Sequence, residues 1–219
     1  MEQKYDPAEI ERTSMAIIER ELSKRRIVLP EDHAAVVKRV IHTTADFDYV
    51  ENLRFTDGAV SLALEALKNG ISIVTDTNMA KSGVSISGLR KLGGEAICLM
   101  ADPEVAAKAK GEGTTRAVSA METAAARWPN AVFAVGNAPT ALFQLAEEIR
   151  KGCRPSLIIA VPVGFVNVVE AKDMIWSVCQ EYSIPVIVAC GRKGGSTVAA
   201  AICNALIYSA AGMTDPSNR

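Results

Sequence analysis

Glycine-rich turns that each follow an apolar run are the segments of this chain best suited to bind an anion. They are GNAPT at 136–140, VPVGFVN at 161–167 and GRKGGST at 191–197. The run before each turn predicts a strand, and the residues after it predict a helix. Glycine lets backbone N–H groups approach a ligand, and a helix N-terminus favours negative charge. In a parallel sheet these turns share the carboxyl edge, where ligands bind, so the sequence predicts a broad anion-binding site there.

The last turn adds positive side chains to this pattern. Arg192 and Lys193 directly precede Gly194, Gly195 and Ser196, which open a predicted helix. Successive backbone N–H groups in such a turn can form a nest for an anion. A tight turn with a purely structural role is the alternative, because glycine commonly serves turns. The adjacent basic pair and the similar turns elsewhere favour ligand binding.

His42 is the candidate for proton transfer. It lies near the end of a helix predicted to begin after Pro30, outside the apolar stripe formed by Val36, Val37, Val40 and Ile41. The dipole at a helix C-terminus favours a protonated imidazole, which can exchange a proton near neutral pH. A structural role for a lone histidine at a helix end stays open. The other histidine, His33, is predicted to be a surface residue in the first turn.

Two further polar residues have both a functional and a structural interpretation. Asp76 directly follows a predicted strand, with Asn78 close by, and such turn residues also cap helices. Lys172 comes soon after the turn at 161–167, so it either faces the same edge or is solvated.

Several classes of ligand site are disfavoured. The run at 71–75 leads into DTNMAK without glycine, GEG at 111–113 lacks a third glycine, and the turn at 191–197 has P-loop residue types in the wrong order. NAD and ATP binding are therefore not expected, and no GxSxG elbow indicates an esterase. The five cysteines contain no CxxC pair, and no cluster has metal-ligand spacing. We expect reduced, mostly buried cysteines and no protein-bound metal.

Composition indicates one globular domain over residues 1–219. The chain has 49% hydrophobic residues and a net charge of −1, so no global field attracts nucleic acid or an anionic membrane. Aromatic residues make up only 5%, which argues against base stacking. The apolar runs are far shorter than the ~20 residues of a membrane span, and the N-terminus has no signal-peptide core. We therefore expect a cytoplasmic protein.

The elements that must position these residues alternate along the chain. Apolar runs at 71–75, 95–99, 131–135, 157–161 and 185–190 are separated by helical patterns. This alternation predicts a three-layer α/β/α fold with a mainly parallel sheet of about five strands. Segment 52–56 is left open as a short extra strand, and 113–116 is expected to start a helix. Additional N-terminal helices precede the sheet, and the first has an apolar stripe of Ile10, Ile17, Ile18 and Leu22, with Ser14 beside it.

The motifs together resemble the precorrin-8X methylmutase family of cobalamin biosynthesis. The similarity runs from about Tyr5 to about residue 208, and it is the combination of motifs that is specific. The matching stretches are VIHTTAD at 40–46, IVTDTNM at 73–79, GNAPTAL at 136–142, PVGFVN at 162–167, EAK at 170–172 and GRKGGS at 191–196.

This resemblance implies an isomerase. Members of the family are homodimers of a three-layer α/β domain, with active sites near the subunit interface. They move a methyl group from C-11 to C-12 of precorrin-8X or cobalt-precorrin-8, giving hydrogenobyrinate or cobyrinate, by a 1,5-sigmatropic shift. No cofactor is implied, because any cobalt is carried by the tetrapyrrole substrate. Both the metal-free and the cobalt-containing substrate stay open, since the two routes share these motifs.

The resemblance also implies roles for particular residues. The catalytic histidine falls on His42, which would donate a proton to the macrocycle. The substrate's acetate and propionate groups would pair with Arg116, Lys172, Arg192, Lys193 and the N–H groups of 194–196. Ser14, Thr43, Thr44, Asp46, Thr77, Met79 and Asn137 would line the site, and Phe165 would pack on the macrocycle.

A non-catalytic tetrapyrrole carrier on the same fold is the main alternative, because it would keep the turns and basic residues without needing His42. A nucleotide-dependent α/β enzyme is a third possibility, which the absent fingerprints disfavour.

Overall fold

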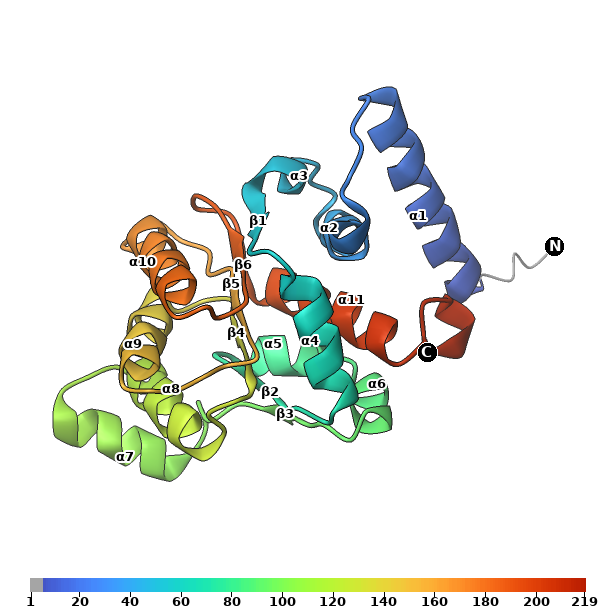
Figure 1. Cartoon of the computed structure of the whole chain (residues 1–219). Coiled ribbons are helices and arrows are strands. Elements are labelled where there is room, and N and C mark those ends of the chain that lie inside the picture. The colour runs from blue at the N-terminus through green and yellow to red at the C-terminus, as the bar shows by residue number, and fades with distance from the viewer. Residues whose placement is uncertain (1–5) are drawn as a thin grey trace.

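The computed structural model describes residues 6–219, which form a mixed sheet with helices on both faces (Figure 1). Its six strands run in the order β1-β6-β5-β4-β2-β3. Neighbouring strands are parallel except β1 and β6, which are antiparallel. The predicted α/β/α class is confirmed. Segment 52–56, for which a short extra strand is one interpretation of the sequence, supplies the sixth strand. The strands are β1 (Leu53–Phe55), β2 (Ile73–Thr75), β3 (Ala96–Ile97), β4 (Val132–Val135), β5 (Leu157–Ala160) and β6 (Val186–Ala189).

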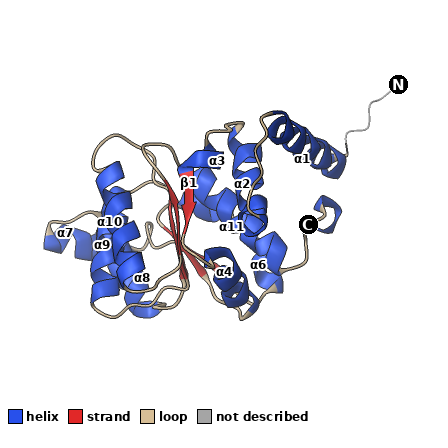
Figure 2. Cartoon of the chain, turned by 45° about the horizontal axis from the view of Figure 1, so that its top comes forward, coloured by secondary structure: helices blue, strands red, loops and turns tan. Residues whose placement is uncertain are grey.

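Two helical layers enclose the sheet, which Figure 2 shows nearly edge-on. None of the helices in residues 6–219 is long and apolar enough to cross a membrane. One layer contains α2 (Glu31–Thr44), α4 (Ala59–Lys68), α5 (Asn78–Gly83), α6 (Ile86–Lys91) and α11 (Ser196–Ala210), with α1 (Pro7–Lys24) outside it. The other contains α7 (Pro103–Glu112), α8 (Arg116–Arg127), α9 (Pro139–Arg150) and α10 (Val168–Glu181). Two short helices, α3 (Tyr49–Asn52) and the 3₁₀ helix η1 (Pro216–Asn218), complete the chain.

The strands read as unbroken apolar runs because both faces of the sheet are covered. In β4, Val132 and Ala134 belong to the core beneath α11, whereas Phe133 and Val135 belong to the core beneath α9. Side chains of successive strand residues point to opposite faces, so one short run serves two cores.

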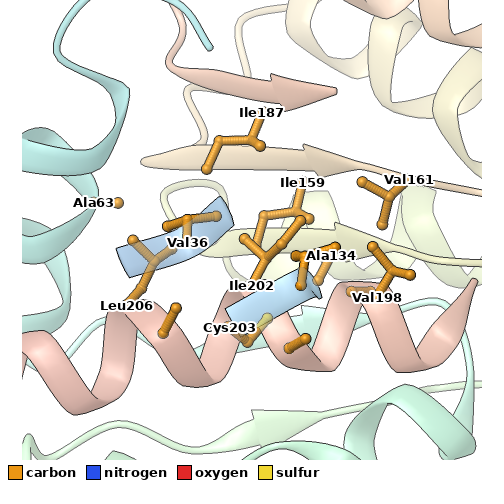
Figure 3. Close-up of a cluster of buried hydrophobic side chains, with 14 of the residues drawn as sticks. Val36, Ala63, Ala134, Ile159, Val161, Ile187, Val198, Ile202, Cys203 and Leu206 are labelled. Atoms are coloured by element: carbon orange, nitrogen blue, oxygen red, sulfur yellow. The ribbon is translucent and has the colours of Figure 1, made fainter. Parts of the chain in front are cut away.

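Helix α11 forms the centre of the first core. Val198, Ile202 and Leu206 line its sheet-facing side, opposite Ala134 and Ile159 (Figure 3). Each is at most 2% exposed, and full burial of such side chains contributes roughly 1.5–3 kcal/mol apiece. The helix therefore holds its N-terminus firmly at the carboxyl edge of the sheet.

Helix α1 corrects one expectation from the sequence. Asp6 caps it, because its side chain accepts from the Ala8 N–H at 3.0 Å. Ile18 and Leu22 are buried, but Ile10 is 54% exposed and Ile17 is 44% exposed. The helix is the outermost element and packs against α2 and η1 (Figure 1). The described chain covers only part of its apolar stripe.

Helix α2 ends in a left-handed residue, Ala45, with φ at 54°. The Ala45 N–H donates to the Ile41 carbonyl at 2.7 Å, which closes the helix and turns the chain toward the sheet. At the other end of the helix, His33 differs from the prediction that it is a surface residue. Its ring stacks on Phe55 with centroids 3.9 Å apart.

Candidate active site

The crevice between β2 and β4 marks the point where the chain changes faces. These strands are neighbours, but β2 leads into α5 on the α11 side, whereas β4 leads into α9 on the opposite side. Ligands of open α/β sheets bind where connections diverge in this way. Because β4, β5 and β6 are parallel, the three glycine-rich turns also lie at this carboxyl edge, as the sequence predicts.

A pocket of about 450 Å³ opens at this point. Among its lining residues are Thr77, Arg116 and Asn137, which sequence reasoning selected from three distant segments. Arg116 is the first residue of α8, and the preceding Thr115 caps that helix by accepting from the Val118 N–H at 3.2 Å. The pocket thus presents a hydroxyl, a guanidinium and an amide to a ligand.

Asp76 closes the floor of the crevice. Its side chain accepts the N–H groups of Gly136 at 2.9 Å, Asn137 at 2.8 Å and Ala138 at 2.8 Å. Burial raises the pKa of Asp76, and these three hydrogen bonds oppose that shift. The N–H groups of the first glycine-rich turn therefore bind a carboxylate of the protein itself, which differs from the expected exposed nest.

The turns after β2, β4 and β6 converge on each other. A Cβ atom at Gly136 would lie 2.7 Å from the Cα of Ser196, so only glycine allows this approach. The hydroxyls of Thr77 and Ser196 are 2.8 Å apart and hydrogen bonded. Two predicted site residues that are far apart in the sequence therefore meet.

The basic turn has fewer available amides than the sequence suggested. A Cβ at Gly194, where φ is 153°, would come within 2.1 Å of the Val161 carbonyl oxygen. The Gly195 N–H donates to that oxygen at 2.8 Å. This donor of the expected nest is thus engaged within the protein, and the contact joins the turn to the end of β5.

Lys172 lies beneath the basic turn instead of reaching the surface offered to a ligand. It is 1% exposed, and its ammonium donates to the carbonyls of Gly191 and Lys193, both at 2.8 Å. Burial lowers the pKa of Lys172 to about 8. Its charge supports the turn from inside.

The side chain of Lys193 connects the same turn to the end of α2. Its ammonium lies 2.6 Å from a carboxylate oxygen of Asp46 and 2.5 Å from one of Asp48. These contacts raise the pKa of Lys193 and lower the pKa of Asp46. Two predicted substrate contacts, Asp46 and Lys193, are therefore paired with each other.

Apolar side chains lie exposed beside these charges. Phe165 is 82% exposed and Met79 is 68% exposed. The Arg192 guanidinium lies over the Phe165 ring, 5.5 Å from its centroid. An exposed aromatic ring beside a guanidinium can pack on a flat ligand while the guanidinium pairs with its negative groups.

His42 lies between α1 and α2. Its Nδ1 is 2.8 Å from the hydroxyl of Ser14, another predicted site residue. Burial, followed by the nearby Arg39 guanidinium and then Arg219, lowers the pKa of His42, although Glu11 opposes the shift. This corrects the expectation that the helix dipole would favour the protonated imidazole.

The two threonines after His42 bond to their own helix. The Thr43 hydroxyl donates to the Arg39 carbonyl at 3.0 Å, and the Thr44 hydroxyl donates to the Val40 carbonyl at 2.8 Å. The Thr44 oxygen also accepts from the Asp46 N–H at 3.2 Å. These bonds shape the turn that leads to the carboxylates paired with Lys193.

A second pocket, of about 330 Å³, lies between α1, α2 and the C-terminal segment. It is lined by Glu11, Arg39 and Arg219, whose charges shift the pKa of His42. Sequence reasoning missed these three residues. Glu11 contacts Arg39 at 2.7 Å and also pairs with Arg219. The sequence did contain a signal for two of them, because Glu11 lies three residues before Ser14 and Arg39 lies three residues before His42. Residues at this spacing are neighbours on a helix surface.

The described residues contain no group of three or more His, Cys, Asp or Glu side chains arranged to hold a metal ion. The five cysteines are unpaired, and Cys153, Cys179 and Cys203 are buried.

The fold and the site define an α/β protein whose turn edge suits an anionic, partly flat ligand and whose outer helices carry a histidine. A family model of precorrin-8X methylmutase matches residues 9–209. The chain therefore belongs to the precorrin-8X methylmutase family, and it is an enzyme of the isomerase class in cobalamin biosynthesis.

Named relatives cover most of the chain. A cobalt-precorrin-8 methylmutase of Salmonella typhimurium is 45% identical over 177 residues, which are 80% of this chain and 81% of that protein. A precorrin-8X methylmutase of Pseudomonas aeruginosa is 38% identical over 202 residues, or 92% and 95% of the two chains. The solved structure of a precorrin-8X methyl mutase from Thermus thermophilus matches with a TM-score of 0.82 and 41% identity, covering 93% of this chain and 98% of that one.

Proposed function

We propose that this enzyme moves a methyl group from C-11 to C-12 of precorrin-8X or cobalt-precorrin-8, giving hydrogenobyrinate or cobyrinate. The observation that carries the proposal is the position of His42, whose Nδ1 lies 2.8 Å from the hydroxyl oxygen of Ser14. The chain that holds this pair belongs to the methylmutase family. The reaction is an intramolecular 1,5-sigmatropic shift, so it needs an acid and a binding site but no electron carrier. We propose accordingly that no cofactor takes part and that any cobalt belongs to the substrate.

His42 is the proposed acid. Ser14 contacts Nδ1, which leaves Nε2 as the ring nitrogen for the macrocycle. Protonation of the macrocycle weakens the bond to the migrating methyl, the methyl moves to the neighbouring carbon, and the proton then returns to the imidazole. The lowered pKa of His42 in the free protein favours neutral imidazole. The carboxylates of a bound substrate raise that pKa and favour the proton donor.

The turn edge is the proposed binding surface. Arg116 and Arg192 are exposed there and can pair with acetate and propionate groups, while Phe165 offers a face to the macrocycle. Charge-assisted hydrogen bonds of this kind contribute roughly 1.5–3 kcal/mol each. Several such contacts hold one face of the macrocycle and one ring carbon in place, which is the main requirement of a shift within one molecule.

We also propose that the enzyme is a cytoplasmic homodimer with its active sites near the subunit interface. The exposed apolar side chains support this arrangement, because Ile10 and Ile17 on α1 and Val166 beside Phe165 have no cover within the described chain. Light scattering coupled to size exclusion measures the assembly directly. A mass equal to one chain at micromolar concentration contradicts the dimer.

The decisive experiment follows the visible absorbance of precorrin-8X, and separately of cobalt-precorrin-8, after mixing with the protein. Conversion to the rearranged corrinoid by wild type but not by His42→Ala supports the proposed acid. Conversion of one substrate only identifies the metal state. Binding without conversion of either substrate instead favours a non-catalytic tetrapyrrole carrier.

A further inference from the structure

We propose that Asp76 is a positioning residue for the methylmutase: its carboxylate occupies the N-terminus of α9 as an internal anion and fixes the Asn137 turn against the Thr77 segment. This inference rests on the proposed function of the pocket at the β2–β4 crevice. Asp76 does not touch the macrocycle in this proposal. It acts through the two residues that do.

The carboxylate of Asp76 is fully engaged within the protein. Asp76 is 1% exposed, and both of its oxygens are used, one by Gly136 and the other by Asn137 and Ala138. The main chain adds another link, since the Asp76 N–H donates to the Ala134 carbonyl at 3.3 Å. Asp76 therefore binds β4 and its turn with both its side chain and its backbone.

The cap that Asp76 provides for α9 comes from far away in the sequence. Helix α9 has Ala138 as its own N-cap residue, which offers no side-chain hydrogen bond. Elsewhere in the chain a local residue does the same work, as Asp102 does for α7 by accepting from the Glu104 N–H at 2.8 Å. A local cap stabilises one helix, whereas a buried carboxylate 60 to 62 residues away also fixes the position of one turn relative to another.

Asp76 also lies next to residues of the pocket. Thr77 follows it directly and bonds to Ser196 at 2.8 Å, and Asn137 is both bonded to Asp76 and exposed in the same pocket. One buried carboxylate thus sets the relative positions of Thr77 and Asn137, the two pocket residues through which it acts. It also fills the positive end of α9, so that the ligand's own carboxylates are directed to Arg116.

The test replaces Asp76 by asparagine, which keeps the size of the side chain but turns an amide group toward the N–H donors. The matched control is Asp102→Asn, which removes the same charge at a local helix cap outside the pocket, where the amide oxygen can still accept the Glu104 N–H. Hydrogen exchange measured by mass spectrometry reports the amides of 136–138, and steady-state kinetics with the precursor separate KM from kcat. The conversion by wild type is measured in the same series.

We expect Asp76→Asn to fold, to exchange the amides of 136–138 faster, and to raise KM at least about tenfold while kcat changes less than about threefold. Asp102→Asn should leave KM unchanged. A purely structural role would lower the active fraction, and hence the apparent kcat, at constant KM, and that result overturns the proposal. Absence of conversion by wild type refutes the proposed function instead.

A second variant guards against misfolding. Asp76→Ala leaves the three N–H donors without an acceptor in a cavity that formate can enter. Formate should restore the low KM, whereas chloride at the same ionic strength should not. If formate has no effect, or if neither variant folds, the positioning role is refuted.

Discussion

The turn edge of the sheet and the α1–α2 layer hold their functional residues by different means. At the turn edge, Asp76 and Lys172 are each 1% exposed, and both bond to backbone groups of the turns. Between α1 and α2, the side chain of Ser14 on α1 contacts the side chain of His42 on α2, and Ile17 of α1 is 44% exposed. Backbone contacts to buried charges leave little freedom, whereas the position of His42 depends on how an outer helix packs.

This difference separates the proposed binding surface from the proposed acid. The turn edge holds the proposed ligand contacts in fixed positions, so substitutions there should change affinity. The α1–α2 layer holds the proposed acid, so substitutions there should change the rate or its dependence on pH.

The largest effect is expected for His42→Ala. Loss of a general acid typically costs about 10²- to 10⁴-fold in rate, so kcat should fall within that range while the dissociation constant of the substrate stays the same. Stopped-flow absorbance gives both values. His33→Ala is the control, because the other histidine of the same helix stacks on Phe55 and should leave turnover unchanged. A comparable loss of affinity in His42→Ala would show that the two regions are not separate.

Arg192→Ala should give the next largest effect. Losing one charge-assisted contact of roughly 1.5–3 kcal/mol weakens substrate binding by about tenfold to more than a hundredfold, most strongly at low salt. Thermal stability should be unchanged, because Arg192 is exposed.

Lys193→Ala removes the neighbouring cation of the same turn. It should lower the melting temperature, since Asp46 and Asp48 lose their shared partner, and it should weaken binding less than Arg192→Ala does, because these carboxylates already engage the ammonium. Titration calorimetry and thermal unfolding of both variants measure the two effects. Equal melting temperatures for the two variants would contradict a tether between the turn and α2.

A smaller effect is expected from Lys172→Met, and it should depend on pH. Burial places the pKa of Lys172 at about 8 in the folded protein, below its ordinary value. Between these two values the unfolded chain binds more protons, so the wild type gains stability as the pH rises. The free energy of unfolding of wild type relative to Lys172→Met should therefore increase from pH 7 to pH 10.

Urea denaturation at several pH values tests this, with the exposed Lys110→Met as the control. A constant difference between wild type and Lys172→Met across this range would mean that the ammonium is not held in a desolvated site.

The smallest effect is expected for Arg39→Gln. Removing the guanidinium eliminates a charge that lowers the pKa of His42 and leaves Glu11, which raises it. If protonated His42 is the acid, activity falls as the pH rises through this pKa, and the variant should shift that fall upward by less than about one pH unit. The pH profile of kcat measures the shift. Arg12→Gln is the control, and an unshifted profile in Arg39→Gln would argue against His42 as the titrating group.

Periodicity and turn chemistry predicted most of the fold. The five predicted runs became β2 to β6, and segment 113–116 starts a helix as expected, with Thr115 as its cap. The predicted stripe on α1 is only partly buried, because an amphipathic pattern shows which face of a helix is apolar but not how much of it a neighbour covers. The sequence also selected Thr77, Arg116 and Asn137, which share a pocket, but it gave no sign that Asp76 would use the N–H groups of the first turn.

By itself the sequence determined the alternation of strands and helices. It thereby placed the glycine-rich turns at one edge, since parallel strands joined by crossovers end on the same side. Only the tertiary structure decided which cations face a ligand. Lys172 is buried under carbonyls, Lys193 is paired with Asp46, and Arg116 and Arg192 stay exposed. The reason is that these contacts join residues up to 147 positions apart, and no local pattern encodes which of several similar charges will meet.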